Sequence, residues 1–391
     1  MQQRSWPEQA FNFGFFFFGY YGFVGVFSPY VSLYFADAGM TAVQIGILMS
    51  LIQMMRIFGP NVWGWAADHL QKRVQVLRFT AAGALASFIG MYFGVTFMQF
   101  FVVMVLLNIF TSAQGPLSEA LMLNEMKGDL THYGMLRLWG SVGYIVAVMA
   151  AGLLLDLRGI GMFPWVGLAL LVLVLSASFR LKETPQPSAQ QKAPSIIALL
   201  KRRELVAFLV SACLMIAAHN SLYVFFSLYL AKLGYSNKLI GLMWALSVVA
   251  EIVFFFYQAP LFRRFGVQRL MMFGLGIAVV RFLMVGLGAE SMLLLLIAQV
   301  LHAATFAAHH SSSIMTLQRW FSGPLQARGQ ALFISVSYGL GGTLGGLGFS
   351  YVWEHVSPEA MYVAAAAVAF GGLIAAKLSF RWQARSEQQS R

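Results

Sequence analysis

The stretch SLYFADAGMTAVQIG at residues 32–46 aligns without a gap on SLYLAKLGYSNKLIG at residues 227–241, with seven identities in fifteen positions. Each copy covers the end of one apolar segment, a short polar turn and the start of the next apolar segment. The same order of features at a shift of 195 residues predicts that the two halves of the chain share one fold.

Around these two copies, the apolar residues are gathered into separate stretches of about 20 residues, the length of helix that crosses about 30 Å of hydrocarbon. The chain is 59% hydrophobic and only 10% charged. The first stretch lacks a small-residue cleavage site, so we expect it to be retained as a helix. We predict an all-α membrane protein with twelve transmembrane helices, at about residues 11–36, 41–64, 75–95, 98–124, 133–156, 160–179, 204–232, 238–261, 270–288, 291–317, 329–352 and 358–379.

The longest polar gap, at residues 182–203, is rich in Gln, Pro, Ser and Lys and has the composition of a linker. It divides the chain into an N-terminal six-helix bundle at 1–180, a linker at 181–203 and a C-terminal six-helix bundle at 204–391. Together with the repeat, this predicts two pseudo-symmetric bundles related by an axis along the membrane normal.

The net charge of +12 could suggest nucleic acid, but the basic residues gather at the N-terminus, in alternate loops and on the C-terminal tail. That is the positive-inside pattern of a multi-pass membrane protein. We therefore expect both termini to be cytoplasmic and exclude a nucleic-acid partner. Cys213 is the only cysteine, so neither a disulfide framework nor a thiolate metal site is available.

Charged or ionisable side chains lie in or beside six of the apolar stretches, at a cost of about 2.5–3.5 kcal/mol for a charge at mid-membrane depth. Such residues persist where they pair or line a polar cavity, so six of them predict a hydrated path through the helices. They are Arg56, Glu119, Arg137, Glu251, Arg281 and His302.

The loop after the second predicted helix, Gly64-Trp-Ala-Ala-Asp68-His-Leu-Gln-Lys72-Arg73, resembles the signature loop of the major facilitator superfamily, G-x-x-x-D-[RK]-x-G-[RK]-[RK]. His69 and Gln71 depart from that pattern. The resemblance implies that Gly64, Asp68, Lys72 and Arg73 form a conformational-switch loop, in which the glycine permits close helix approach. The alternative is an ordinary basic loop.

A closer likeness covers most of the chain and resembles the bacterial 3-phenylpropionic acid transporter group, which is related to the oligosaccharide:proton symporters. It is carried by Pro116–Glu119, Tyr133-Gly134, Arg137–Gly143, His219, Val249–Glu251, Phe262–Arg264, Val280-Arg281, Leu301-His302, Thr305-Phe306 and His310. The symporters place Glu and Arg at the substrate site on helices four and five, and Glu, Arg and His at the proton-coupling site on helices eight to ten. The position of a further symporter carboxylate on helix ten is Thr305 here.

The resemblance implies substrate binding by Glu119 and Arg137 and proton coupling by Glu251, Arg281 and His302. From their charge or polarity within apolar stretches, we also expect Arg56, Arg281 and His219 to bind substrate and His310 to take part in proton coupling. A carboxyl held between burial, which favours its neutral form, and an arginine, which favours its charged form, can switch protonation. For each residue the alternative is a structural role. Glu251 could pair permanently with Arg281 or Arg137, Glu119 could simply bridge to Arg137, and the arginines and histidines could bond neighbouring helices.

The expected function is alternating-access transport of a small organic, aromatic acid with a proton, in a bacterial cytoplasmic (inner) membrane. We expect a monomer that is driven by the proton gradient and needs neither a cofactor nor a metal. We do not expect it to be an enzyme. An excess of arginine over carboxylate suits an anionic substrate. The alternatives are a proton symporter for a sugar or nucleoside and an exporter of lipophilic compounds. Aromatic residues such as Tyr20, Tyr21 and Tyr223 either pack between helices or flank the substrate.

Overall fold

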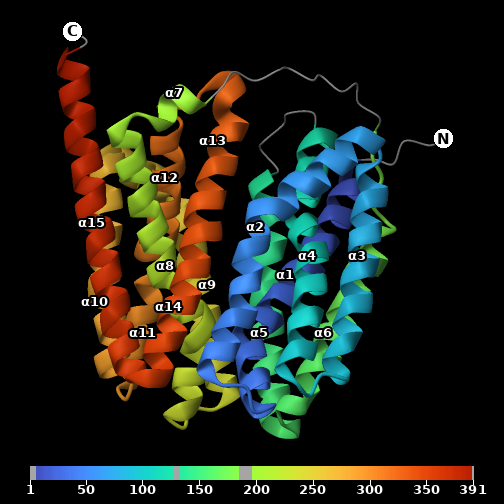
Figure 1. Cartoon of the computed structure of the whole chain (residues 1–391). Helices are drawn as coiled ribbons and strands as arrows, with labels where there is room; N and C mark the ends of the chain where they lie inside the picture. Colours follow the sequence, from blue (N-terminus) through green and yellow to red (C-terminus); the bar gives the residue numbers. More distant parts are fainter. Residues whose placement is uncertain (1–5, 127–132, 185–195, 390–391) are drawn as a thin grey trace. The chain divides into compact units, whose positions relative to one another are not determined.

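The computed structural model describes residues 6–126, 133–184 and 196–389, and within them the chain is helical with no strand (Figure 1). Twelve stretches in this described part are long and apolar enough to cross a membrane, which confirms the predicted all-α membrane fold. The N-terminal helices are α1 (Trp6–Asp37), α2 (Ala42–Leu70), α3 (Arg73–Ile89), α4 (Phe97–Glu125), α5 (Tyr133–Arg158) and α6 (Phe163–Ser178).

A short helix, α7 (Ile197–Leu200), lies within the predicted linker, of which residues 185–195 are outside the described residues. The later helices are α8 (Arg203–Lys232), α9 (Asn237–Phe265), α10 (Val267–Gly288), α11 (Met292–Val300), α12 (His309–Leu317), α13 (Gln326–Phe333), α14 (Gly342–His355) and α15 (Pro358–Gln389). Two π-helical segments, η3 (Ala303–Ala308) and η5 (Ile334–Gly341), join α11 to α12 and α13 to α14.

The first compact unit comprises residues 1–189 and 230–245. In it α1 packs against α5 and α6, while α4 packs against α2 and α3. Glycines on α5 make the central contact close, because a Cβ at Gly143 would collide with the backbone of Phe18 on α1. Three phenylalanines of α1, Phe13, Phe16 and Phe17, are fully buried in the apolar core of this unit.

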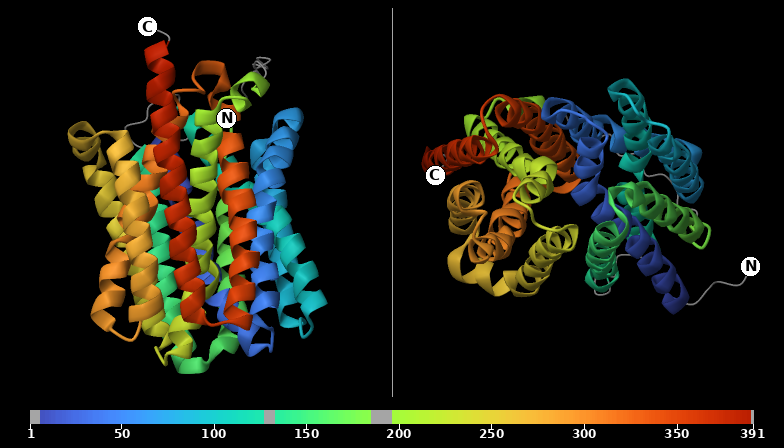
Figure 2. Two further views of the ribbon diagram at one scale, coloured as in Figure 1. Left: turned by 60° about the vertical axis from the view of Figure 1, so that its left-hand side comes forward. Right: turned by 90° about the horizontal axis from the view of Figure 1, so that it is seen from below.

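The second unit comprises residues 190–229 and 246–391. Here α10 packs against α15 and against η3 and α12, and α14 packs against α15. The glycine run before and within α14 brings two backbones together, since a Cβ at Gly341 or Gly345 would collide with the carbonyls of Cys213 and Ala217 on α8. Figure 2 shows the helices of this unit end-on in its right-hand view, coloured from lime through orange to red.

The start of α9 belongs with the first unit because α5 holds it. The Asp156 carboxylate accepts hydrogen bonds from the backbone N–H groups of Asn237 (2.8 Å) and Lys238 (2.9 Å). The Tyr30 hydroxyl of α1 contacts the carbonyls of Val148 (2.8 Å) and Asn237 (3.2 Å). Nothing in the sequence indicated that residues 230–245, which follow the linker, pack with the first unit. The predicted boundary between the bundles at 181–203 stays a prediction.

Candidate functional site

In the first unit, three helices bring a carboxylate, a guanidinium and a phenol together. Arg137 Nε of α5 lies 3.2 Å from Glu119 Oε1 of α4, and both side chains are 34% exposed. The Tyr21 hydroxyl of α1 donates to the same carboxylate oxygen at 3.4 Å. The Arg137 guanidinium carbon lies 4.0 Å from the centre of the Tyr21 ring, a distance typical of cation–π contacts.

The backbone of α5 makes this contact possible. Gly140 lies one turn from Arg137, and a Cβ there would collide with the Tyr21 ring, so the missing side chain lets α1 and α5 approach. The Arg137 bond to Glu119 uses Nε, which leaves the outer edge of the guanidinium as a fork suited to a carboxylate. A partly exposed arginine beside aromatic rings can bind an anion with an aromatic body. The remaining expected binding residue of this unit, Arg56, lies on α2 with an exposed side chain.

In the second unit, Glu251 of α9 lies against His302, with 2.7 Å between Oε1 and Nε2. The two side chains are 17% and 5% exposed. At that separation a proton lies between the two atoms, on one or the other. The opposite ring nitrogen, His302 Nδ1, is buried and has no hydrogen-bond partner in the part of the chain that the structure describes. The structure thus pairs Glu251 with a titratable partner.

Arg281 of α10 is 2% exposed and is held by neutral oxygens. Its Nε donates to the Ala298 carbonyl at 2.6 Å, and its outer nitrogens donate to Thr305 Oγ1 at 3.2 Å and Gln299 Oε1 at 3.5 Å. These contacts agree with the structural alternative, in which the arginines bond neighbouring helices. Arg281 therefore sits beside the Glu251–His302 pair as a fixed positive charge.

Thr305 joins Arg281 to the histidines. His219 Nε2 lies 3.3 Å from Thr305 Oγ1, and His219 Nδ1 lies 2.9 Å from the Met215 carbonyl. Because a carbonyl only accepts, Nδ1 carries the proton in neutral His219, and Nε2 then accepts from the Thr305 hydroxyl. If His219 were protonated, the Thr305 hydroxyl would turn to the His302 carbonyl, which lies 3.3 Å away. His219 thus lies with the predicted coupling residues, in the other unit from Glu119 and Arg137.

The π-helical segment η3 aligns His302 with His310. The His302 ring stacks on Phe306 at 5.4 Å between centroids, and Phe306 stacks on His310 at 6.1 Å. The wider i→i+5 turn of a π-helix brings residues four and eight apart into one line. His310 Nδ1 contacts the Tyr338 hydroxyl at 3.2 Å. Among the described residues no cluster of three or more His, Cys, Asp or Glu could hold a metal ion.

The loop after α2 is held by its acidic residue. Asp68 Oδ1 accepts from Arg73 at 2.8 Å, and Gln71 takes the left-handed conformation with φ of 52°. The family pattern has glycine at this position. Gln71 has a Cβ, which makes the left-handed backbone conformation strained. Lys72 is exposed and precedes α3. Gly64 meets nothing within 4 Å of an added Cβ, so the close helix approach expected there is not seen in the described residues.

Sequence reasoning missed two members of these clusters. Tyr21 was expected either to pack between helices or to flank the substrate, and only the structure shows that its hydroxyl donates to Glu119 and that its ring lies against the Arg137 guanidinium. From the sequence we noted only that Thr305 stands where the related symporters have a carboxylate. In the structure its hydroxyl contacts both Arg281 and His219. A polar residue three positions after His302 was the available signal.

Comparison with known proteins places these clusters in context. The family model described as "MFS_1 like family" matches residues 11–364. The chain is 29% identical to the "Probable 3-phenylpropionic acid transporter" of Escherichia coli (strain K12), over 83% of this chain and 86% of the relative. It is 28% identical to "Maltose permease" of Geobacillus stearothermophilus, over 89% of each chain. The solved structure of nucleoside transporter NupG superposes with a TM-score of 0.85 at 18% identity, covering 95% of this chain and 99% of that one.

Proposed function

The chain belongs to the MFS_1 like family, and from that premise we propose that this secondary transporter carries a small aromatic carboxylate together with a proton. Its relatives are permeases of small molecules, which agrees with transport in place of catalysis. The observation that carries the proposal is the Glu119–Arg137–Tyr21 cluster, where a partly exposed guanidinium lies between a carboxylate and an aromatic face.

The substrate class follows from the chemistry of that cluster. An arginine fork binds a carboxylate through two parallel hydrogen bonds, and aromatic rings stack favourably against an aromatic body. Tyr20 and Tyr21 lie 4.9 Å apart in an edge-to-face arrangement beside Arg137. The 29% identity to a relative named for 3-phenylpropionic acid supports an aromatic monocarboxylate such as 3-phenylpropionate.

Proton coupling is assigned to the Glu251–His302 pair. A carboxylate and an imidazole that lie 2.7 Å apart can share a proton. Because both groups are largely buried, release of that proton depends on water reaching the pair. Arg281 adds a fixed positive charge that favours the deprotonated carboxylate. His219 and His310 extend this cluster through Thr305 and Phe306.

We propose that this multi-pass protein lies in the bacterial cytoplasmic membrane with both termini inside; the concentration of basic residues in alternate loops supports this orientation. We propose that it works as a monomer driven by the proton gradient, without a cofactor or metal. Alternating access would expose the site to each side in turn.

The test is uptake of labelled 3-phenylpropionate into proteoliposomes with an imposed pH gradient. Wild-type protein should accumulate the acid, whereas Arg137→Gln should lower the rate at least about tenfold, because a hydrogen bond to a charged group contributes about 1.5–3 kcal/mol. Arg158→Gln, at the end of the same helix, is the matched control and should transport normally. Absence of uptake of every aromatic acid tried would refute the substrate class.

A sugar or nucleoside substrate is the second candidate, favoured by the maltose permease likeness over 89% of the chain. Thermal stabilisation of the purified protein separates the two. Aromatic carboxylates should raise the melting temperature, and maltose or nucleosides should leave it unchanged. The reverse ranking would select the second candidate.

A further inference from the structure

The helix α12 turns a polar face into the interior of the second unit. His309, Ser312, Ser313 and Thr316 recur at the spacing that places side chains on one face of a helix, and they are between 0% and 3% exposed. Met315 lies off this face and is 39% exposed. The buried face of a membrane-spanning helix is therefore polar over about two turns.

The fold does not require polar groups at this position. The helix α4 holds the corresponding fourth place in the first unit, and its buried residues Leu117, Leu121 and Met122 belong to an apolar core. Burial of a polar group costs free energy unless the group is hydrogen-bonded. The polar face of α12 therefore needs an explanation other than packing.

The hydroxyls on this face lack the bond that other helix hydroxyls of this chain make. The buried hydroxyls of Ser118 and Ser350 donate to a carbonyl of their own helix at 2.9 and 2.7 Å, as serine commonly does in helices. The hydroxyls of Ser312 and Ser313 make no hydrogen bond to any described residue, and neither does His309 Nε2. Because buried polar atoms are nearly always bonded to protein or to ordered water, these three atoms point to a bound partner.

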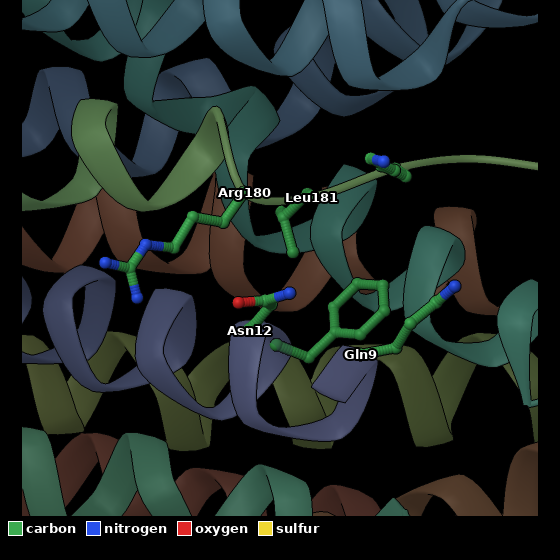
Figure 3. A pocket seen from close by; sticks show the side chains of 6 residues that line it. Gln9, Asn12, Arg180 and Leu181 are labelled. Atoms are coloured by element: carbon green, nitrogen blue, oxygen red, sulfur yellow. The ribbon is translucent and has the colours of Figure 1, made fainter. Parts of the chain in front are cut away.

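This arrangement differs from that of the small pocket at the start of α1. Figure 3 shows Gln9 and Asn12 of α1 opposite the segment that carries Arg180 and Leu181. The basic side chains of that pocket, Arg180 and Lys182, are exposed, so solvent satisfies their polar atoms. The free groups of α12 are buried and need a partner inside the unit.

The polar face of α12 continues the cluster around Thr305. Gly274 of α10 lets that helix lie close to η3 and α12, because a Cβ there would lie 2.7 Å from the Ala304 carbonyl oxygen and 3.7 Å from His309 Cβ. His309 is also near enough to His219, the partner of Thr305, for the charge of one ring to act on the other. The unpartnered groups thus begin where the described cluster ends.

The same polar region runs from the Glu251–His302 pair to the exposed end of the helix. The His302 ring lies 5.9 Å from the His219 ring, and its Nδ1 is buried without a partner among the described residues. From His302 to Ser313 the chain advances about 16 Å along the helix axis. The helix ends about one turn after Ser313, and Arg319 beyond it is exposed and is among the basic residues that indicate the cytoplasmic side.

We propose that α12 lines a water-filled route by which the coupling proton leaves the Glu251–His302 pair for the cytoplasm. This rests on the proton coupling proposed above for that pair. Hydroxyls and a neutral imidazole both donate and accept hydrogen bonds. A buried water needs about two to four such partners, and His309, Ser312 and Ser313 provide them.

The transfer along this route conserves protons. The pair gives one proton to a water molecule beside His302 Nδ1. Each water then accepts one proton and passes one on, until one proton enters the cytoplasm and the pair is left with one fewer. Only O–H and N–H bonds form and break, and the substrate cluster in the first unit takes no part.

Thiol labelling tests the route without any substrate. In a Cys213→Ser background, Ser312→Cys and Ser313→Cys should each react with N-ethylmaleimide at least about tenfold faster than the controls, because only the thiolate reacts and it forms where water reaches the thiol. The controls are Ser118→Cys and Ser350→Cys, which replace equally buried hydroxyls that are bonded within their own helices. Rates for Ser312→Cys and Ser313→Cys as low as those of the controls would overturn the route.

Alkylation of Ser313→Cys then tests whether the proton uses the route. In proteoliposomes the alkylated variant should lose accumulation of 3-phenylpropionate under a pH gradient, while the unreacted variant keeps it. Exchange at equal pH should continue in both, because exchange requires no net proton movement. Unchanged accumulation after alkylation, or an equal loss of exchange, would overturn the proton's use of the route. Absence of uptake before alkylation would count against the proposed substrate, and the labelling rates would still decide whether the route is hydrated.

Discussion

Glu251 and His302 form the contact in the second unit to which we assign proton coupling. A carboxylate oxygen 2.7 Å from an imidazole nitrogen, with both groups largely buried, can exist with one shared proton or with an added one. Because a buried charge is costly unless it is paired, the protonation state of one residue constrains the other. This gives the pair the properties of a switch.

Replacing Glu251 by Gln tests that assignment. The variant cannot release a proton at this position, so gradient-driven accumulation of substrate should fall to the equilibrium level, at least about tenfold below wild type. Substrate exchange across the membrane at equal pH should continue, because it requires no net proton movement. Accumulation at the wild-type level in this variant would place the coupling proton elsewhere.

Thr305 is the residue that ties the cluster together. Replacing it by Val removes the acceptor of Arg281 and the partner of His219, leaving buried polar groups unsatisfied at a cost of about 1–3 kcal/mol. We expect a melting temperature several degrees below wild type in detergent. Thr316→Val is the control: among the described residues that buried hydroxyl bonds the Ser312 carbonyl in its own helix and nothing else, so its loss should shift the melting temperature less. Equal shifts would deny Thr305 its linking role.

At the scale of elements, the N-terminus of α9 is capped by a residue from another helix. Asp156 lies 81 residues before Asn237 in sequence, and its two carboxylate oxygens accept from two consecutive N–H groups. A helix N-terminus carries a partial positive charge and unpaired donors, which explains why an exposed acid is fixed there. The contact stabilises both the cap and the attachment of this segment to the first unit.

Asp156→Ala should remove that cap. We expect a loss of about 1 kcal/mol, the usual contribution of an acidic N-cap, and faster hydrogen exchange at the amides of Asn237 and Lys238. Asp156→Asn keeps one acceptor oxygen and should show a smaller effect. Asp37→Ala, an exposed acid at the end of α1, serves as the control and should leave exchange at these amides unchanged. Unaltered exchange in Asp156→Ala would disprove the capping role.

For the whole molecule, the ionic residues sort into two groups. The cluster that suits an anionic substrate, Glu119, Arg137 and Tyr21, lies in the first unit, and the cluster that suits a proton, Glu251, His302, Arg281 and His219, lies in the second. The repeated sequence thus produced one architecture twice with different side chains in each copy. This division favours separate sites for substrate and proton.

One proton carried with one monocarboxylate moves no net charge. Uptake should therefore follow an imposed pH gradient, inside alkaline, and should not respond to a membrane potential set by potassium and valinomycin. Proteoliposomes with each gradient imposed alone measure this directly. Uptake driven by voltage alone would require more than one proton for each anion and would contradict the single shared proton at Glu251.

Much of the fold could be predicted from the sequence. Twelve apolar stretches and the repeat at 32–46 and 227–241 indicated the helices, because hydrocarbon forces every backbone polar group into a helix of known length. Charged residues within those stretches also selected Glu119, Arg137, Glu251, Arg281 and His302, since each carries a cost that needs a partner. The identity of each partner was less accessible, since the sequence alone left both a switching role and a structural pair with an arginine open for Glu251.

The sequence by itself therefore determined the membrane class, the helix count and which residues carry unusual chemistry, because these follow from local composition. Only the tertiary structure decided that Glu251 meets His302, that Tyr21 joins Glu119 and Arg137, and that Asp156 caps α9. These contacts join residues on different helices, and their partners depend on the rotation and packing of each helix, which hydropathy does not encode.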